Sequence, residues 1–153
     1  METNRRGAET RREDNLTEGI IGCAIEVHKA LGPGLLESAY EECLCFELAQ
    51  NGYRLERQVP LPVVYKGITL DCGYKMDVVV DDFVVLELKT VEKILPIHEA
   101  QLLTYLKLYR RQLGLLLNFN VPVLKDGVKR LVNNYKEASQ PQRLSVSAVK
   151  DNL

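Results

Sequence analysis

The stretch that most constrains the fold is residues 73–90, GYKMDVVVDDFVVLELKT, because it sets charged side chains into two apolar runs. These runs, residues 78–80 and 83–86, are β-branched, aromatic or aliphatic at every position, which is typical of strands covered on both faces. An ionised group in such a strand is costly unless it is paired, hydrated in a cleft or bound to a metal ion. The sequence therefore predicts a buried hairpin that carries a polar site.

Three charged residues of this hairpin could share one site. Glu87 and Lys89 are separated by one residue, so in a strand their side chains project from the same face. With Asp77 on the neighbouring strand, they would supply two hard oxygen ligands for a divalent cation and one positive charge to stabilise a developing anion. Phosphodiester cleavage requires such a set. The same residues also allow an ordinary ion pair between Asp77 and Lys89, with Glu87 at the solvent edge.

The connection between the two strands decides whether the carboxylates can meet. A tight turn with residues 81–82 at its centre pairs Asp77 with Leu86 and turns Glu87 to the opposite face of the sheet. We therefore predict an extra loop residue, a β-bulge or a bend in residues 73–77.

Two helical motifs extend the pattern. Residues 34–40, GLLESAY, have the form G-x-x-E-x-x-Y at the start of a helix, and residues 98–109, HEAQLLTYLKLY, place Gln101 and Tyr105 one helical turn apart. With these motifs and the strands LDCGYKMDVVV and VLELKT, the chain resembles the GxxExxY family over about residues 16–135. That family lies in the RecB-type branch of the PD-(D/E)XK nuclease-like superfamily.

The resemblance implies an α/β (α+β) fold with a restriction-endonuclease-like core, in which helices flank a mixed central sheet. It also implies a cofactor, Mg²⁺ or Mn²⁺, held by Asp77 and Glu87, with Glu37 joining directly or through water. Lys89 matches the catalytic lysine of the superfamily.

The resemblance assigns Gln101 and Tyr105 to substrate binding. Tyr40 lies three residues after Glu37, close to the same helix face, and we expect it to contact the substrate as well.

The expected function is that of a metal-dependent phosphodiesterase, a nuclease, whose partner is nucleic acid, with DNA favoured over RNA. A catalytically silent binding or scaffold protein of the same fold is the main alternative. A small-molecule hydrolase is a weaker one, because the sequence offers no distinctive specificity pocket.

Length and composition indicate one globular domain, since 46% of the 153 residues are hydrophobic and 27% are charged. We place this domain at residues 15–136, between a disordered or expression-derived tail at residues 1–14 and a flexible tail at residues 137–153. No apolar run approaches the length of a membrane span and no secretory signal is seen, so we expect a cytoplasmic protein with no membrane partner.

Other polar residues add little to the expected function. The four cysteines fit no zinc template and are expected to be reduced. His28 and His98 could border the cleft, although a helix cap or a solvated helix face is the favoured role. A net charge of −1 argues against bulk electrostatic binding of a duplex. Two local basic clusters leave the charge argument neutral: one is Lys107, Arg110 and Arg111, and the other is Lys125, Lys129 and Arg130.

Overall fold

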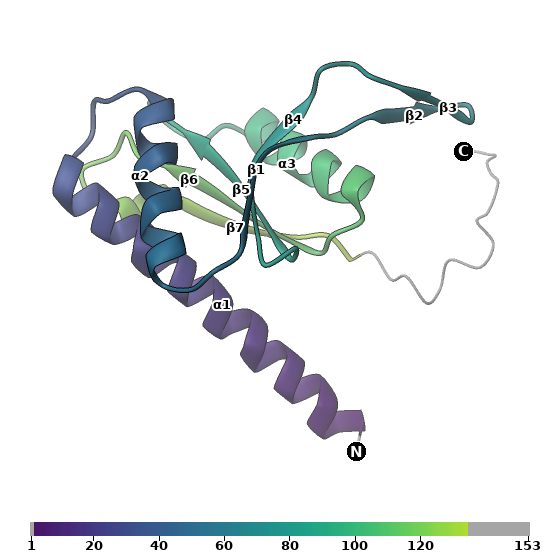
Figure 1. Cartoon of the computed structure of the whole chain (residues 1–153), viewed down its shortest axis with the longest axis horizontal. Helices are drawn as coiled ribbons and strands as arrows, with labels where there is room; N and C mark the ends of the chain where they lie inside the picture. Colours follow the sequence, from purple (N-terminus) through teal and green to yellow (C-terminus); the bar gives the residue numbers. More distant parts are fainter. Residues whose placement is uncertain (1, 135–153) are drawn as a thin grey trace.

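The computed structural model describes the backbone of residues 2–134 and the side chains of residues 7–134 (Figure 1). The predicted C-terminal tail, residues 137–153, lies outside the described residues. The helices are α1 (Glu2–Leu31), α2 (Glu37–Gln50), α3 (Pro96–Tyr109) and the short 3₁₀ helix η1 (Leu124–Gly127). The strands are β1 (Leu55–Pro60), β2 (Val63–Tyr65), β3 (Ile68–Leu70), β4 (Lys75–Val80), β5 (Val84–Lys89), β6 (Leu113–Asn118) and β7 (Val128–Val132).

The central sheet has five strands in the order β1-β4-β5-β6-β7. All neighbouring pairs are antiparallel except β5 and β6, which are parallel. Parallel neighbours need a long crossover, and α3 supplies it. This mixed sheet flanked by helices confirms the expected restriction-endonuclease-like α+β fold.

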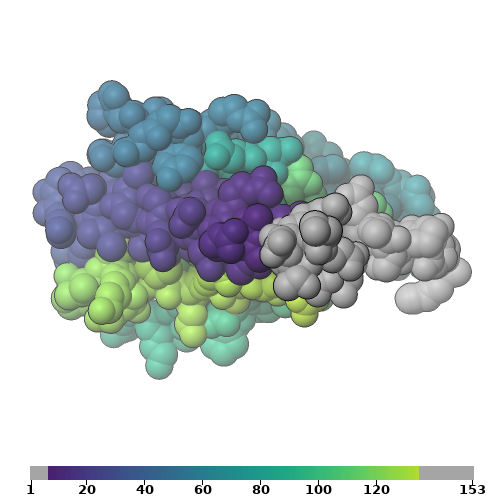
Figure 2. All heavy atoms as spheres, turned by 90° about the horizontal axis from the view of Figure 1, so that it is seen from below, coloured from purple at the N-terminus to yellow at the C-terminus, as the bar shows by residue number. Residues whose placement is uncertain are grey.

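Helices cover both faces of the sheet, which explains why its central strands are apolar throughout. On one face, α1 and α2 pack on alternate residues of β4, β5 and β6. On the other face, α3 packs on the intervening residues. Seen from the side of α1, this helix lies between α2 and the segment of residues 120–134 (Figure 2).

Helix α1 begins at Glu2, before the expected start of the domain at residue 15. Residues 2–14 are therefore helical, where a disordered or expression-derived tail was expected. No proline interrupts this segment, and opposite charges such as Glu9 and Arg12 stand at helical spacing. Although α1 has 30 residues, no helix in the described part of the chain is long and apolar enough to span a membrane.

The segment of residues 54–65 forms two separate strands. Its first part is β1, while β2 leaves the sheet and pairs with β3 in a separate two-stranded ribbon that projects from the domain (Figure 1). Prolines at positions 60 and 62 have no backbone N–H to donate to a strand ladder. Strand β1 therefore lies at the edge of the central sheet and ends at Pro60.

Candidate active site

The β4–β5 hairpin sets Asp77 directly across from Glu87. Three residues, 81–83, connect the strands, where a tight turn would have two. The resulting register pairs Val78 with Leu86, Val79 with Val85 and Val80 with Val84. The next positions outward are Asp77 and Glu87. The extra loop residue is therefore one of the irregularities that the sequence required, and it brings the two carboxylates together.

The two carboxylates are held by the backbone of each other's strand. The backbone N–H of Asp77 donates to Oε2 of Glu87 at 3.0 Å. The backbone N–H of Leu88 donates to Oδ2 of Asp77 at 2.9 Å. Carboxylate oxygens thus accept the bonds that backbone carbonyls accept in a regular ladder. The sheet opens at this point, and both side chains have fixed positions.

The regular alternation of side chains along strand β4 is broken at Asp77. Met76 packs in the core under α3, whereas Val78, two residues later, packs in the core under α1 and α2. Regular alternation would place both on one side. Across from Asp77 on β1, Gln58 has a left-handed backbone with φ of +50°. Such a conformation costs a non-glycine residue on the order of 1 kcal/mol. Both strands are therefore distorted where Asp77 lies.

Burial and mutual repulsion disturb the ionisation of both carboxyl groups. Glu87 is only 7% exposed, and burial raises its pKa to about 8, with the charge of Asp77 adding to the effect. Burial also raises the pKa of Asp77, against the N–H of Leu88, which lowers it. In the described residues, neither carboxylate forms an ion pair within 4.0 Å. When both carboxyl groups are ionised, no basic side chain of the described residues pairs with them directly, and a bound cation would stabilise the ionised forms.

Glu37, the first residue of α2, faces the same site. Although the residue as a whole is exposed, partial burial of its carboxyl group raises its pKa, and the charge of Asp77 raises it further. Lys89 lowers the pKa of Glu37, Asp77 and Glu87 alike, so its ammonium group lies near all three. The structure thus brings together the four residues predicted to be catalytic.

The ordinary ion pair weighed from the sequence does not form. Among the described side chains, Lys89 has no ion pair within 4.0 Å, with Asp77 or with any other carboxylate. Its positive charge remains available to a further anion.

Helix α3 brings Gln101 and Tyr105 to the site from the other face of the sheet. Nε2 of Gln101 donates to the hydroxyl of Tyr105 at 3.1 Å. Tyr105 is 7% exposed, and its pKa is raised by burial and then by the charge of Glu87. The ring of Tyr74, just before β4, lies 6.1 Å from that of Tyr105. An aromatic pair and an amide therefore border the carboxylates.

The prediction that Tyr40 contacts substrate is wrong. Its side chain is completely buried and stacks on Phe119, with ring centroids 4.5 Å apart. Its hydroxyl donates to the carbonyl of Gly32 at 2.5 Å and accepts from the N–H of Leu35 at 3.1 Å. Tyr40 therefore fixes the loop that leads into α2, and so the position of Glu37.

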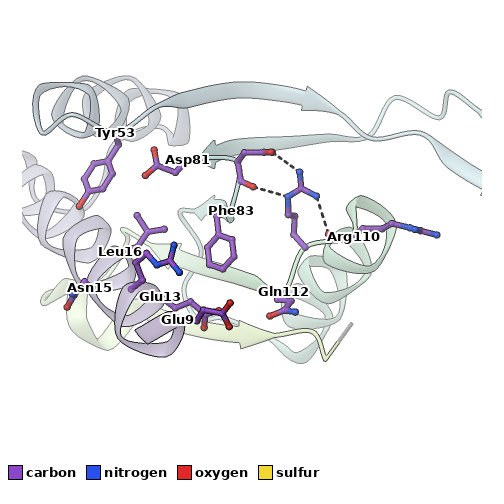
Figure 3. A pocket seen from close by; sticks show the side chains of 12 residues that line it. Glu9, Glu13, Asn15, Leu16, Tyr53, Asp81, Phe83, Arg110 and Gln112 are labelled. Atoms are coloured by element: carbon purple, nitrogen blue, oxygen red, sulfur yellow. Dashed lines mark hydrogen bonds and ion pairs between the residues drawn. The ribbon is translucent and has the colours of Figure 1, made fainter. Parts of the chain in front are cut away.

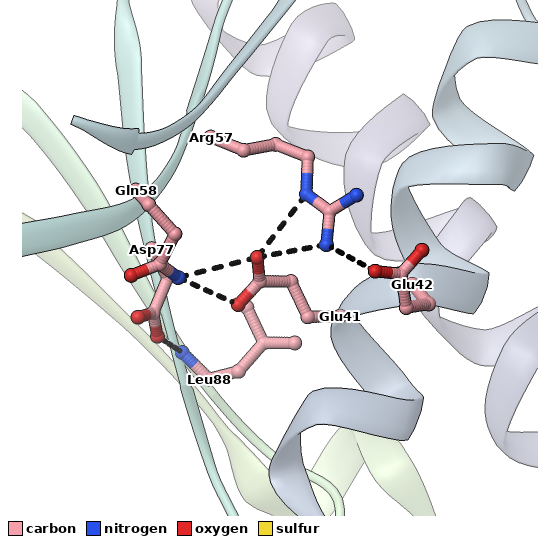
Figure 4. A network of polar contacts seen from close by, with 6 residues as sticks. All are labelled: Glu41, Glu42, Arg57, Gln58, Asp77 and Leu88. Atoms are coloured by element: carbon pink, nitrogen blue, oxygen red, sulfur yellow. Dashed lines mark hydrogen bonds and ion pairs between the residues drawn. The ribbon is translucent and has the colours of Figure 1, made fainter.

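A second group of polar residues was not predicted from the sequence (Figure 4). Glu41 is buried, and its carboxylate accepts hydrogen bonds from Arg57 at 3.1 and 3.2 Å and from Nε2 of Gln58 at 3.0 and 3.2 Å. Arg57 also pairs with the exposed Glu42 at 2.9 Å. One signal was available, because Glu41 follows Glu37 by four residues and so shares its helix face.

Asn118 was also missed. It is 1% exposed at the end of β6, next to Lys89 in the parallel register. Its side chain donates to the carbonyl of Val91 at 2.9 Å and accepts from the N–H of Val91 at 3.1 Å. Asn118 thereby fixes the chain just after Lys89. A lone polar residue at the end of the run LGLLLN was the available signal.

The histidines and cysteines lie apart from this chemistry. Nε2 of His28 bonds to the carbonyl of Val121 at 2.8 Å in the core, and Nδ1 of His98 accepts from the N–H of Leu95 at 2.9 Å at the start of α3. All four cysteines are free, as expected. The basic clusters are partly engaged, since Arg111 pairs with Asp82 at 2.7 Å and Lys129 with Glu99 at 3.7 Å.

A hollow of about 860 Å³ lies at the other end of the hairpin (Figure 3). Its lining includes Tyr53, Phe83, the turn of residues 81–82 and the N-terminal half of α1. Both acidic and basic side chains line it, and none of the predicted site residues contributes to it. The hollow is therefore distinct from the carboxylate site.

The donors suit a hard divalent cation. Asp77 and Glu87 present carboxylate oxygens, the ligands that Mg²⁺ and Mn²⁺ prefer. In residues 7–134, no three Asp, Glu, His or Cys side chains are close enough to hold a metal ion together. Two carboxylates suffice for Mg²⁺, which usually retains several waters. Asp77 and Glu87 would therefore hold the ion, and Glu37 does not form a group of three ligands with them.

Comparison with known proteins agrees with this geometry. A family model described as the PD-(D/E)XK nuclease superfamily matches residues 14–131, well over half of the chain. No curated protein and no solved structure gives a match. The matched region includes the whole hairpin, α2 and α3, and therefore every residue of the candidate site. The chain belongs to the PD-(D/E)XK nuclease superfamily.

Proposed function

We propose that this protein hydrolyses phosphodiester bonds in nucleic acid with the help of Mg²⁺ or Mn²⁺, and that it belongs to the GxxExxY family and the RecB-type branch. One observation carries the proposal. Two carboxylates, Asp77 and Glu87, lie opposite each other in an opened sheet, each held by a backbone N–H. Two buried carboxylates that no basic side chain in the described part of the chain pairs with are costly to ionise unless a cation is bound there.

Each residue has a distinct part in the proposed reaction. Asp77 and Glu87 bind the cation, which when present lowers the pKa of a bound water and withdraws charge from the phosphate. Glu37 accepts a hydrogen bond from a water of the site. Lys89 uses its unpaired ammonium group to hold the attacking water or to offset charge on the phosphoryl oxygens.

The substrate lies along the side of the site that α3 provides. Gln101 donates hydrogen bonds to the nucleic-acid backbone, and the ring of Tyr105, with that of Tyr74 beside it, offers a surface for stacking on a base. Tyr40 has no part in binding. Since the net charge of −1 gives no general attraction to a duplex, these local contacts carry the recognition. DNA is the preferred substrate.

A cleavage assay tests the proposal. Labelled single-stranded DNA, duplex DNA and RNA are incubated with the protein and Mg²⁺, Mn²⁺ or EDTA. We expect cleavage with either metal ion and none in EDTA. Asp77→Asn and Lys89→Ala should each abolish cleavage while circular dichroism and the melting temperature show a folded domain.

Two results would contradict the proposal. Binding of nucleic acid without cleavage under all conditions would identify a catalytically silent binding protein. If Lys89 is only structural, Lys89→Ala should destabilise the domain, and cleavage should match the wild type once it is corrected for the folded fraction.

A further inference from the structure

Gln58 has a backbone conformation that a strand does not need. It lies within β1, between Arg57, which pairs with Val78, and Val59, which pairs with Met76. The strand register is continuous on both sides, so no residue has been inserted there. Nevertheless φ of Gln58 is +50°, in the left-handed region. A strained conformation in a strand that keeps its register on both sides persists only where the surrounding contacts enforce it.

The strained backbone redirects the Gln58 side chain. Consecutive side chains of a strand point to opposite faces, yet Arg57 and Gln58 both donate to the same carboxylate, that of Glu41. Nε2 of Gln58 lies 3.0 Å from Oε1 and 3.2 Å from Oε2 of Glu41. Glu41 is itself 8% exposed and is held by Arg57. The Gln58 amide is therefore fixed from the side of α2.

The amide that Glu41 fixes also reaches Asp77. Gln58 stands opposite Asp77 by position, because the residues on either side of it pair with Val78 and Met76. Figure 4 shows the end of the Gln58 side chain between Glu41 and Asp77, with the N–H of Leu88 on the far side of Asp77. The Gln58 side chain also lowers the pKa of Asp77. Asp77 thus lies between the N–H of Leu88 from β5, which donates to it, and the amide of Gln58 from β1.

We propose that Gln58 is a positioning residue, which Glu41 and Arg57 lock into a strained conformation so that its amide orients the Asp77 carboxylate toward Glu87. Insofar as it concerns a metal ion, this inference rests on the proposed function of the site. Residues that orient metal ligands typically change metal affinity by about 10- to 100-fold when they are replaced. Gln58 should therefore affect metal binding without touching the metal or the substrate.

Two variants at position 58 separate positioning from folding. Gln58→Gly removes the side chain but adopts a φ of +50° without strain, so it should not destabilise β1. Gln58→Met keeps the length of the side chain and removes the amide. Glu42→Gln is the matched control, because Glu42 holds Arg57 from its exposed side and does not contact Gln58.

The first measurement needs no metal. Since the N–H of Leu88 donates to Asp77, its hydrogen exchange reports whether the carboxylate stays in place. In EDTA, we expect exchange of the Leu88 amide to accelerate at least about 10-fold in both Gln58 variants and to stay unchanged in Glu42→Gln. Equal protection in wild type and both variants, or equal loss in the control, would overturn the inference.

The second measurement is the Mg²⁺ concentration that gives half-maximal cleavage and half-maximal thermal stabilisation. We expect both to rise about 10-fold or more in the Gln58 variants, with Glu42→Gln resembling the wild type. Unchanged values in a wild type that responds to Mg²⁺ would overturn the positioning role. A wild type that does not respond would overturn the proposed function instead, and the Leu88 amide would still decide the role of Gln58.

Discussion

Replacing Glu87 with glutamine should stabilise the metal-free protein, and increasingly so as the pH rises. The two side chains have nearly the same shape, and the glutamine oxygen can still accept the N–H of Asp77. Glutamine removes the negative charge that burial and Asp77 disfavour. The variant therefore isolates the energetic cost of keeping a second carboxylate ionised at this site.

The expected size follows from the pKa of Glu87. Folding raises this pKa from 4.5 to about 8. The folded state then binds the proton more tightly than the unfolded state, so wild-type stability is full below pH 4.5 and falls as the pH rises toward 8. One pKa unit corresponds to about 1.4 kcal/mol, which sets an upper limit of about 5 kcal/mol. Because Asp77 shares the repulsion, we expect a gain of about 2 to 5 kcal/mol for Glu87→Gln above pH 8.

Urea denaturation in EDTA at pH 5, 6.5 and 8.5 measures this gain, with far-UV circular dichroism as the probe. Glu18→Gln, which neutralises an exposed carboxylate on α1, is the control and should show no such trend. If the stability difference between Glu87→Gln and wild type stays constant from pH 5 to 8.5, Glu87 does not carry the unfavourable buried charge.

Three further predictions concern the surroundings of the site. Tyr40→Phe should lose about 1–3 kcal/mol in urea denaturation, because it leaves the carbonyl of Gly32 and the N–H of Leu35 without their partner, while cleavage per folded molecule should persist; loss of cleavage alone would return Tyr40 to the active site. Asn118→Ala should lose a similar amount, since the partly buried N–H and carbonyl of Val91 lose their partner, and an unchanged midpoint would contradict this. Mn²⁺ at 100 times its dissociation constant should stabilise the wild type by about 2.7 kcal/mol, and Asp77→Asn should abolish the rise in melting temperature; an equal rise in that variant would remove Asp77 from the site.

The hairpin is well predicted from the sequence, because its strands and its turn depend on residues that are close together in the chain. Continuous apolar runs identify β4 and β5, and the count of residues between them shows that Asp77 and Glu87 meet only through an irregular connection. Asp81 and Asp82 both have positive φ, as in a type I′ turn, and the N–H of Phe83 closes this turn on the carbonyl of Val80 at 2.9 Å. Phe83 is then the extra residue before β5, which the turn type alone does not predict. The spacing of Gln101 and Tyr105 likewise follows from one helix.

Features that depend on contacts between distant elements could not be predicted in this way. Glu41 and Gln58 are 17 residues apart and meet only when α2 packs beside β1. Tyr40 lies three residues after Glu37 and so close to the same helix face. Its ring nevertheless lies in the core, where it stacks on Phe119, the residue that follows β6. The expected start of the domain was too late, because a charged segment without apolar periodicity resembles a tail in the sequence. The ion pair between Asp14 and Arg130, at 3.8 Å, joins this segment to β7 and depends on the folded structure.

The central claim is that Asp77 and Glu87 bind a divalent cation. Anomalous scattering from a crystal soaked in Mn²⁺ tests it most directly, because the signal identifies the metal and its ligands together. We expect one peak between these carboxylates, about 2.1 Å from an oxygen of each, with waters completing the shell and Glu37 reached through one of them. No peak at saturating Mn²⁺, or a peak only at other side chains, would show that Asp77 and Glu87 do not bind the cation.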